Sequence, residues 1–167
     1  MKKNREKIYT IDVLAAELAK LKSEGKIIVL CHGCFDLMHP GHILYFQAAK
    51  ELGDILVVKV TPDKYVDKGD GRPVFNQDLR MMSIAALECV DYVAVNQWQT
   101  AVETLKTLLP NKYVKGQEFE KLVDKTGKIQ KEYAVLKEIG AEMCFTHEIV
   151  FSSTELINRY FLRDDKR

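Results

Sequence analysis

Apolar residues along the chain form two kinds of pattern. Short continuous runs are typical of buried strands, and i, i+3, i+4 spacings are typical of amphipathic helices. The runs predict strands at 26–31, 55–61, 92–96, 112–116 and 142–146. The helical spacings predict helices at 11–24, 41–52, 77–88, 100–109, 129–139 and 154–162. Because strands alternate with helices, we predict an α/β fold: a doubly wound, Rossmann-like parallel sheet with helices on both faces. The expected order of its five strands is 3-2-1-4-5.

Two of the predicted helices have clear inward faces. The helix at 11–24 lies between Thr10, a typical N-cap residue, and Gly25, a typical C′ residue, and it is expected to cover the sheet. Its apolar positions are Ile11, Leu14, Leu18 and Leu21. For the helix at 77–88 the expected inward positions are Leu79, Met82, Ala86 and Leu87.

Length and composition limit the class of protein. The 167 residues suit a single domain, 1–167, with the helix at 11–24 preceding the first strand. A net charge of +1 from 25 basic and 24 acidic residues predicts neither nucleic acid nor a membrane surface as a partner. The four irregularly spaced cysteines suit a reducing compartment, and neither a membrane-spanning run nor a signal peptide is evident. We therefore expect a cytoplasmic location.

The most informative stretch is residues 31–42, where an apolar strand leads into a turn and a helix start. Pro40 suits the first helical turn, and Gly41 allows the backbone to approach a ligand. The free N–H groups at such a helix start bind anions. His39 and His42, three residues apart, place their imidazoles on one side of the turn, so the stretch predicts a site for a phosphate chain.

The predicted sheet order places this stretch at a ligand crevice. In doubly wound sheets, ligands lie outside the carboxyl ends of the strands where the strand order reverses, here between strands one and four. The turn with His39 and His42 follows strand one, and Lys115 and Gly116 end strand four. We expect these residues to flank one crevice.

The pattern G-x-F-D-x-x-H-x-G-H resembles the signature of the HxGH nucleotidyltransferase superfamily, which includes cytidylyltransferases and ADP-heptose synthase. It consists here of Gly33, Phe35, Asp36, His39, Gly41 and His42. The segments 68–74, 85–93 and 114–116, together with Arg80, resemble the nucleotidyltransferase domain of ADP-heptose synthase. The resemblance runs from about 26 to 159, which is nearly the whole chain.

This resemblance implies transfer of a nucleoside monophosphate from a nucleoside triphosphate to a sugar phosphate such as heptose 1-phosphate, with release of pyrophosphate. Catalytic roles are implied for His39, His42 and Lys68, and Asp36 is expected to face the acceptor. The implied nucleotide-binding residues are Gly33, Cys34, Phe35, Gly41, Arg72, Lys115, Ser152, Ser153, Thr154 and Arg159. Mg²⁺ is expected to arrive with the triphosphate and to have no dedicated protein ligands.

Two further segments carry some of these residues. The segment 62–77 is broken up by glycine and proline and carries Lys68 and Arg72, so we expect a lid that closes over phosphates. The run 152–159 is similar to the S-T-T-x-I-I-x-R helix start that holds the β- and γ-phosphates in the resembling family. A helix-capping role is expected for one of its three hydroxyl residues.

Alternatives remain open. Cytidylyltransferases of the glycerol-phosphate type carry an arginine five residues before the first serine of that run, where this chain has His147, so CTP-dependent transfer to glycerol 3-phosphate is the second hypothesis. A catalytically silent nucleotide-binding domain is the third. A zinc or thiol site at Cys31 and Cys34 is disfavoured, because the four residues between Cys34 and His39 are too few for a finger. We expect these cysteines to be packing residues.

Several properties are not determined by the sequence. The expected partners are small molecules, namely a nucleoside triphosphate and a sugar phosphate. The base, the acceptor and the oligomeric state, including a homodimer, stay open. So does the choice between a stand-alone enzyme and a part of a larger kinase-fused protein.

Overall fold

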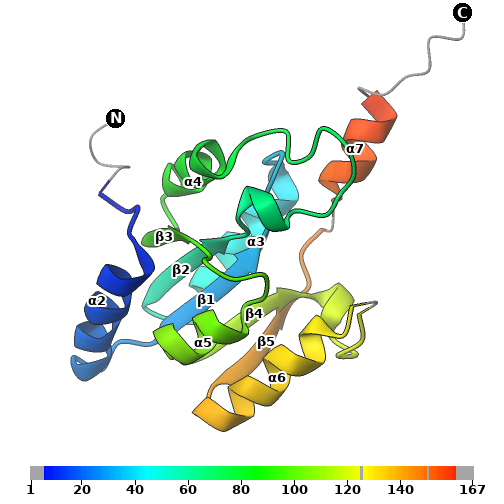
Figure 1. Cartoon of the computed structure of the whole chain (residues 1–167). Helices are drawn as coiled ribbons and strands as arrows, with labels where there is room; N and C mark the ends of the chain where they lie inside the picture. Colours follow the sequence, from blue (N-terminus) through cyan, green and yellow to red (C-terminus); the bar gives the residue numbers. More distant parts are fainter. Residues whose placement is uncertain (1–5, 125, 150, 161–167) are drawn as a thin grey trace, which may run out of the picture.

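The computed structural model describes residues 6–124, 126–149 and 151–160 of the chain. Five strands form one sheet, in which every pairing of neighbouring strands is parallel and the order is β3-β2-β1-β4-β5 (Figure 1). The strands are β1 (Ile28–Gly33), β2 (Ile55–Val60), β3 (Tyr92–Val95), β4 (Lys112–Gly116) and β5 (Glu142–Thr146). The predicted fold class and strand order are confirmed.

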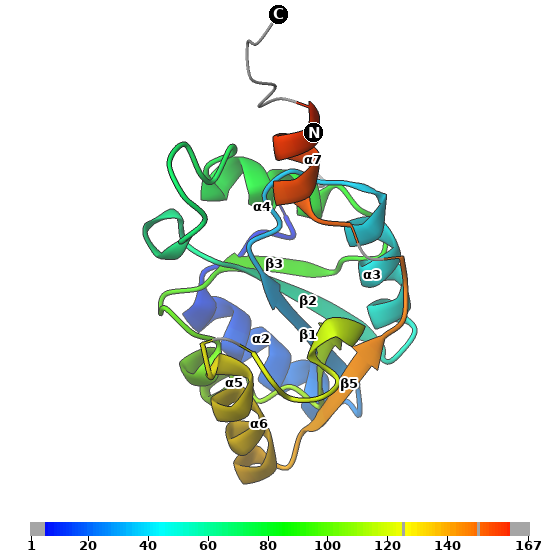
Figure 2. The same cartoon turned by 90° about the vertical axis from the view of Figure 1, so that its right-hand side faces the viewer.

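Helices cover both faces of this sheet (Figure 2). One face packs against α2 (Ile11–Ser23), α5 (Val102–Leu108) and α6 (Lys128–Ile139). The other face packs against α3 (Pro40–Lys50) and α4 (Gln77–Ala85). The last described helix, α7 (Ser153–Tyr160), lies beyond the carboxyl edge of the sheet, and short 3₁₀ turns occur at η1 (Asp63–Tyr65) and η2 (Gln117–Phe119).

The core consists of two apolar layers, one on each side of the sheet. On the α2 side, Leu30 of β1 packs with Leu14 and Leu18 of α2. On the α3 side, Cys31 packs with Phe46. Each such side chain, when fully buried, contributes about 1.5–3 kcal/mol. The predicted cover helix is therefore confirmed, and the central strand is apolar on both faces because both are covered.

The inward face of α4 differs from the prediction. Leu79, Met82 and Ala86 are exposed, whereas Arg80 and Ile84 are fully buried. The guanidinium of Arg80 donates to the backbone carbonyls of Cys34, Thr61 and Phe75 and pairs with Asp63. Leu87, just past the end of α4, packs against the core as predicted. For the other three positions the apolar pattern indicated the wrong side, because Arg80 is one of the buried residues of this helix.

Within the described part of the chain, none of the helices is both long enough and apolar enough to cross a membrane.

Candidate active site

A cavity of about 550 Å³ opens at the carboxyl edge of the sheet, where the strand order reverses between β1 and β4. This volume lies within the range of about 300–1,000 Å³ that is usual for ligand pockets. Nine of the predicted site residues line it: Gly33, Cys34, Phe35, Asp36, Gly41, His42, Lys68, Lys115 and Ser153. The expectation that the histidine turn and the end of strand four flank one crevice is confirmed.

The two histidines of the motif form a stacked pair at the start of α3. Their ring centroids are 3.7 Å apart and their planes differ by 16°. His39 is the N-cap residue, and its Nδ1 accepts a hydrogen bond from the backbone N–H of His42 at 3.3 Å. The proton of a neutral His39 is therefore on Nε2, which is buried and has no hydrogen-bond partner among the described residues. His42 lines the cavity itself, and His39 lies directly behind it.

Both imidazoles are neutral near pH 7. Burial lowers the pKa of His39, against a backbone hydrogen bond that raises it, and the charge of Lys68 lowers this pKa further. Burial also lowers the pKa of His42 to about 3, assisted by His39 and Lys68. Lys68 lines the same cavity as His42. The pair thus offers neutral N–H donors beside a lysine, an arrangement suited to a phosphate group.

Two glycines of the motif make room for this pair. A Cβ at Gly33 would lie 2.8 Å from the ring of Phe35, which sits at φ 49° and packs edge-on against His42 at 5.4 Å. A Cβ at Gly41 would lie 3.0 Å from the carbonyl oxygen of Ile149 and 3.2 Å from Nδ1 of His39. Both glycines therefore allow close packing that fixes the positions of the two imidazoles.

Asp36 anchors the segment that carries Lys68. Its carboxylate is buried and accepts hydrogen bonds from Nε of Arg72 and the backbone N–H of Val74, both at 2.9 Å, and from the N–H of Phe75 at 3.0 Å. Burial raises the pKa of Asp36, but these hydrogen bonds outweigh burial and lower the pKa overall. Both carboxylate oxygens are engaged, so the predicted contact with an acceptor stays a prediction, although Asp36 lines the cavity.

Arg72 connects this anchor to the start of α7. Its Nη1 donates to Oγ1 of Thr154 at 3.4 Å, and its buried Nη2 has no partner among the described residues. Arg72 and Thr154 do not line the cavity, so their predicted contacts with nucleotide stay predictions.

The serines before and at the start of α7 have separate roles. Oγ of Ser152 accepts from the backbone N–H of Glu155 at 3.3 Å, so the expected capping role belongs to this residue. Ser153 is buried, lines the cavity and donates to the carbonyl of Leu37 at 3.1 Å. Arg159 is exposed, lies over the ring of Tyr160 at 5.4 Å and does not line the cavity, so its role in binding nucleotide stays a prediction.

Lys115 is held at the other end of the cavity. Its Nζ pairs with the buried Oε2 of Glu132 at 3.2 Å and lies over the rings of Tyr113 and Phe119. His32 of β1 also lines this end, and its buried Nδ1 has no partner among the described residues. Sequence reasoning missed His32 and Glu132. The signal available for His32 was its place at the end of the strand that leads into the motif.

The cysteines do not assemble a metal site in the described residues. Cys31 is fully buried in the core, and Cys34 lies on the following loop with its Sγ 3.9 Å from Nη1 of Arg80. No group of three or more His, Cys, Asp or Glu side chains in this part of the chain is placed to hold a metal ion. The absence of bound zinc stays a prediction.

A parallel sheet with paired imidazoles and lysines in its switch-point cavity defines a nucleotide-binding α/β protein. Residues 30–159 match the family described as cytidylyltransferase-like, so the chain belongs to this family of nucleotidyltransferases.

Curated relatives agree with this assignment. The bifunctional protein HldE of Campylobacter fetus subsp. fetus is 39% identical over 162 residues, which are 92% of this chain and 31% of that protein. The bifunctional protein HldE of Citrifermentans bemidjiense is 42% identical over 120 residues, which are 71% of this chain and 25% of that protein. The chain thus spans about a quarter to a third of the length of these relatives. The resemblance to the nucleotidyltransferase domain of ADP-heptose synthase is confirmed.

Solved structures give the same picture. The lipopolysaccharide core biosynthesis protein from Thermoplasma volcanium GSS1 superposes with a TM-score of 0.61 at 26% identity, covering 75% of this chain and 100% of that one. A pantoate-beta-alanine ligase from Francisella tularensis superposes with a TM-score of 0.62 at 14% identity, covering 90% and 72% of the two chains. At that identity, the second likeness concerns the fold alone.

Proposed function

We propose that this chain transfers a nucleoside monophosphate from a nucleoside triphosphate to a sugar phosphate resembling heptose 1-phosphate. A phosphate oxygen of the acceptor attacks the α-phosphorus, the bond from the α-phosphorus to the bridging oxygen breaks, and pyrophosphate leaves. The observation that carries the proposal is the stacked pair of neutral histidines at the start of α3, of which His42 lines one cavity with Lys68, Lys115 and Ser153.

Catalysis in this proposal consists of positioning and charge stabilisation, because both reactants already carry the reacting oxygens. Nε2–H of His39 and the ring of His42 donate to the α-phosphate as negative charge builds on it. Lys68 closes over the phosphates from its exposed loop, and the start of α7, with Ser153 and the free Nη2 of Arg72, holds the departing pyrophosphate.

Mg²⁺ fits this proposal as an ion carried by the triphosphate. The described residues offer no cluster of three His, Cys, Asp or Glu side chains for it, which suits an ion bound mainly by substrate phosphates and water. When bound, the ion supplies neutralisation of phosphate charge, and the chain supplies the donors described above.

Transfer to heptose 1-phosphate is supported by the similarity to the HldE proteins. The glycerol-phosphate alternative lacks its arginine, since His147 stands in that place, is exposed and pairs with Glu120 at 3.4 Å.

The test is a pyrophosphate-release assay of the purified chain with Mg²⁺ and either ATP or CTP, against heptose 1-phosphate and glycerol 3-phosphate. We expect release only with heptose 1-phosphate, and a nucleoside diphosphosugar of the corresponding mass. Turnover with CTP and glycerol 3-phosphate alone would favour the alternative. No release in any of the four combinations would indicate a silent nucleotide-binding domain.

A further inference from the structure

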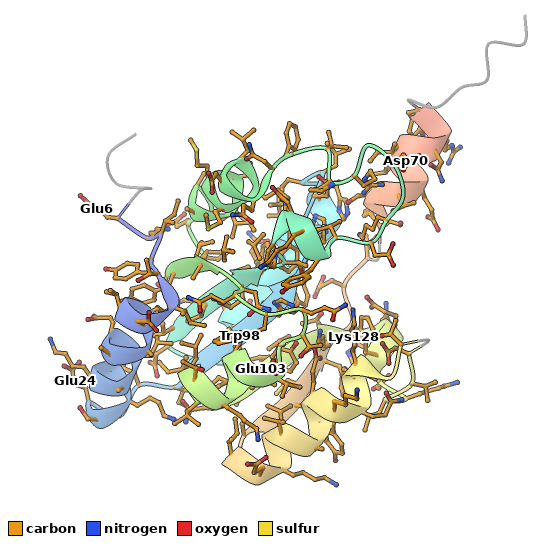
Figure 3. The ribbon with its side chains drawn as sticks, in the orientation of Figure 1. Glu6, Glu24, Asp70, Trp98, Glu103 and Lys128 are labelled. Atoms are coloured by element: carbon orange, nitrogen blue, oxygen red, sulfur yellow. The ribbon has the colours of Figure 1, made fainter. Side chains whose placement is uncertain are left out.

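The cavity extends past the histidine pair to a second, polar end, which we name the inner end and define by His32, Gln99, Thr100, Lys115, Lys128 and Glu132. These residues come from β1, β4, the β3–α5 connection and the start of α6. Lys128 stands at the end of α6 nearest the carboxyl edge of the sheet (Figure 3). The cavity is lined by lysines from separate segments, which are Lys68 of the β2–α4 loop, Lys115 of β4 and Lys128 of α6.

His32 offers an unused hydrogen-bonding group at this end. Its Nδ1 is buried, lacks a partner among the described residues and belongs to a side chain that lines the cavity. Burial lowers its pKa to about 3, and the charges of Lys115 and Lys59 add to the effect. A backbone hydrogen bond with Lys59 raises this pKa, so one ring nitrogen is engaged there, and the unpartnered Nδ1 is the nitrogen left to form a hydrogen bond with a ligand hydroxyl.

Glu132 presents a fixed carboxylate to the same cavity. The residue is 3% exposed, and its Oε2 accepts from the hydroxyl of Tyr113 at 3.1 Å and pairs with Lys115 at 3.2 Å. A carboxylate has about four acceptor positions, so two contacts leave acceptor capacity free. Because Tyr113 and Lys115 hold the group, it needs no reordering to bind a ligand hydroxyl.

The chemistry of the inner end suits a polyol better than a phosphate or a base. Glu132 is paired with Lys115, which leaves Lys128 as the other cation of the inner end. Tyr113 is fully buried and does not line the cavity, and the ammonium of Lys115 lies 5.4 Å from the ring centroid of Phe119, so one face of that ring is covered. The imidazole, carboxylate, amide and hydroxyl groups that line the inner end can each exchange a hydrogen bond with a sugar hydroxyl.

We propose that the inner end binds the polyhydroxylated part of the acceptor, and that His32 and Glu132 determine which sugar is accepted. This rests on the proposed function. The acceptor phosphate then lies toward His42, and the sugar extends away from it toward α6.

The test compares His32→Ala and Glu132→Gln with the wild-type chain in steady-state kinetics, varying heptose 1-phosphate and ATP (or CTP, if that is the active triphosphate) separately. We expect KM for heptose 1-phosphate to rise about 10-fold or more, because each variant removes a sugar contact, while KM for the triphosphate stays within about twofold. Glu138→Gln, an exposed position on the same helix, is the matched control and should change neither KM.

The outcomes separate the two proposals. If the wild-type chain releases no pyrophosphate with any sugar phosphate, the proposed function fails. If it does, but both variants keep the wild-type KM for the acceptor, or raise KM for the triphosphate instead, the inference about the inner end is overturned. Thermal unfolding identifies a variant that fails to fold, and calorimetric titration of the folded variant with heptose 1-phosphate then decides the question.

Discussion

The stacked imidazoles of His39 and His42 have to bind a phosphate and also lie face to face, and two charged imidazoles would repel each other in that arrangement. Phosphate binding favours a cationic group, yet burial against Phe35 and beside Lys68 keeps both rings neutral before substrate arrives. A neutral pair can lie face to face at 3.7 Å without charge repulsion. Its donors are thus in place before charge develops on the α-phosphate, which is what preorganised catalysis requires.

Acid should destabilise the fold through His42. Its pKa is about 3 in the folded chain and 6.5 as the ordinary value, so the unfolded chain binds the proton first as pH falls. Stability present above pH 6.5 is therefore lost toward pH 3. When the pH falls from about 7.5 to about 5, the free energy of unfolding measured in urea should drop by about 1–2 kcal/mol more for the wild-type chain than for His42→Gln.

The control for this measurement is His147→Gln, which changes an exposed histidine and should follow the wild-type pH dependence. If acidification lowers the free energy of unfolding equally for the wild-type chain and for His42→Gln, then His42 titrates normally in the folded state.

Replacing Cys31 or Cys34 by serine should leave kcat within a few-fold of the wild-type value. Cys31 packs in the core and Cys34 contacts Arg80, and neither is placed with other metal ligands among the described residues. Metal analysis of the purified protein should find less than one zinc per chain. One tightly held zinc that either substitution removes would contradict this assignment.

At the scale of single residues, the sequence was informative where local geometry makes the site. The positions of the glycines and histidines between Gly33 and His42 follow from the sequence of this stretch itself, because a turn and a helix start are short-range structures. Glu132 could not be found in the same way. A glutamate on a helix surface usually meets solvent, and only the packing of α6 on β4 buries it against Tyr113.

At the scale of elements, α4 holds the loop that follows β1 in place through Arg80, whose guanidinium donates to the carbonyl of Cys34 in that loop. Arg80→Ala removes donors to three backbone carbonyls and the pair with Asp63, so it should lower the free energy of unfolding by about 3 kcal/mol or more. Met82→Ala, on the exposed side of the same helix, should change it by less than about 0.5 kcal/mol. Equal, small effects of the two substitutions in denaturant unfolding would refute this role of Arg80.

In the loop between β2 and α4, bound nucleotide should slow amide exchange in the middle of the loop and leave exchange at its end unchanged. Residues 67–71 are exposed, whereas the amides of Val74 and Phe75 are bound to Asp36. Amide exchange at 67–71 should be fast in the free chain and slow with triphosphate, while Val74 and Phe75 stay protected in both states.

Lys68→Ala should weaken both turnover and the ligand-induced protection of this loop. Lys64→Ala, an exposed lysine earlier in the same loop that does not line the cavity, is the control. Unchanged exchange at 67–71 on adding triphosphate would mean that the loop is no lid.

Helix and strand positions were predictable because their periods are local properties, and most bounds agree within about two residues. The predicted end of the last helix, at 162, lies outside the described residues. The inward face of α4 was not, since a buried arginine with several backbone acceptors looks like a surface residue in a polarity pattern. The connection of Asp36 to Arg72 was also out of reach, because it joins residues 36 positions apart through a folded loop.

At the scale of the whole molecule, the strand order β3-β2-β1-β4-β5 brings distant segments to one cavity. Alternation of strands and helices was enough to predict that crevice from the sequence. The acceptor and the base are a different matter, since they depend on side-chain positions around the cavity rather than on topology. The chain corresponds to about a quarter to a third of its curated relatives, so its activity has to be measured on the chain itself.

The central claim is that this cavity performs nucleotidyl transfer at the histidine pair. The most direct measurement is formation of the nucleoside diphosphosugar from triphosphate and heptose 1-phosphate, followed by mass spectrometry for the wild-type chain, His39→Ala, His42→Ala and the double variant. The account predicts that each single substitution lowers kcat about 100-fold or more, with KM for the triphosphate changed only a few-fold. A double variant that forms product at a near wild-type rate would contradict it.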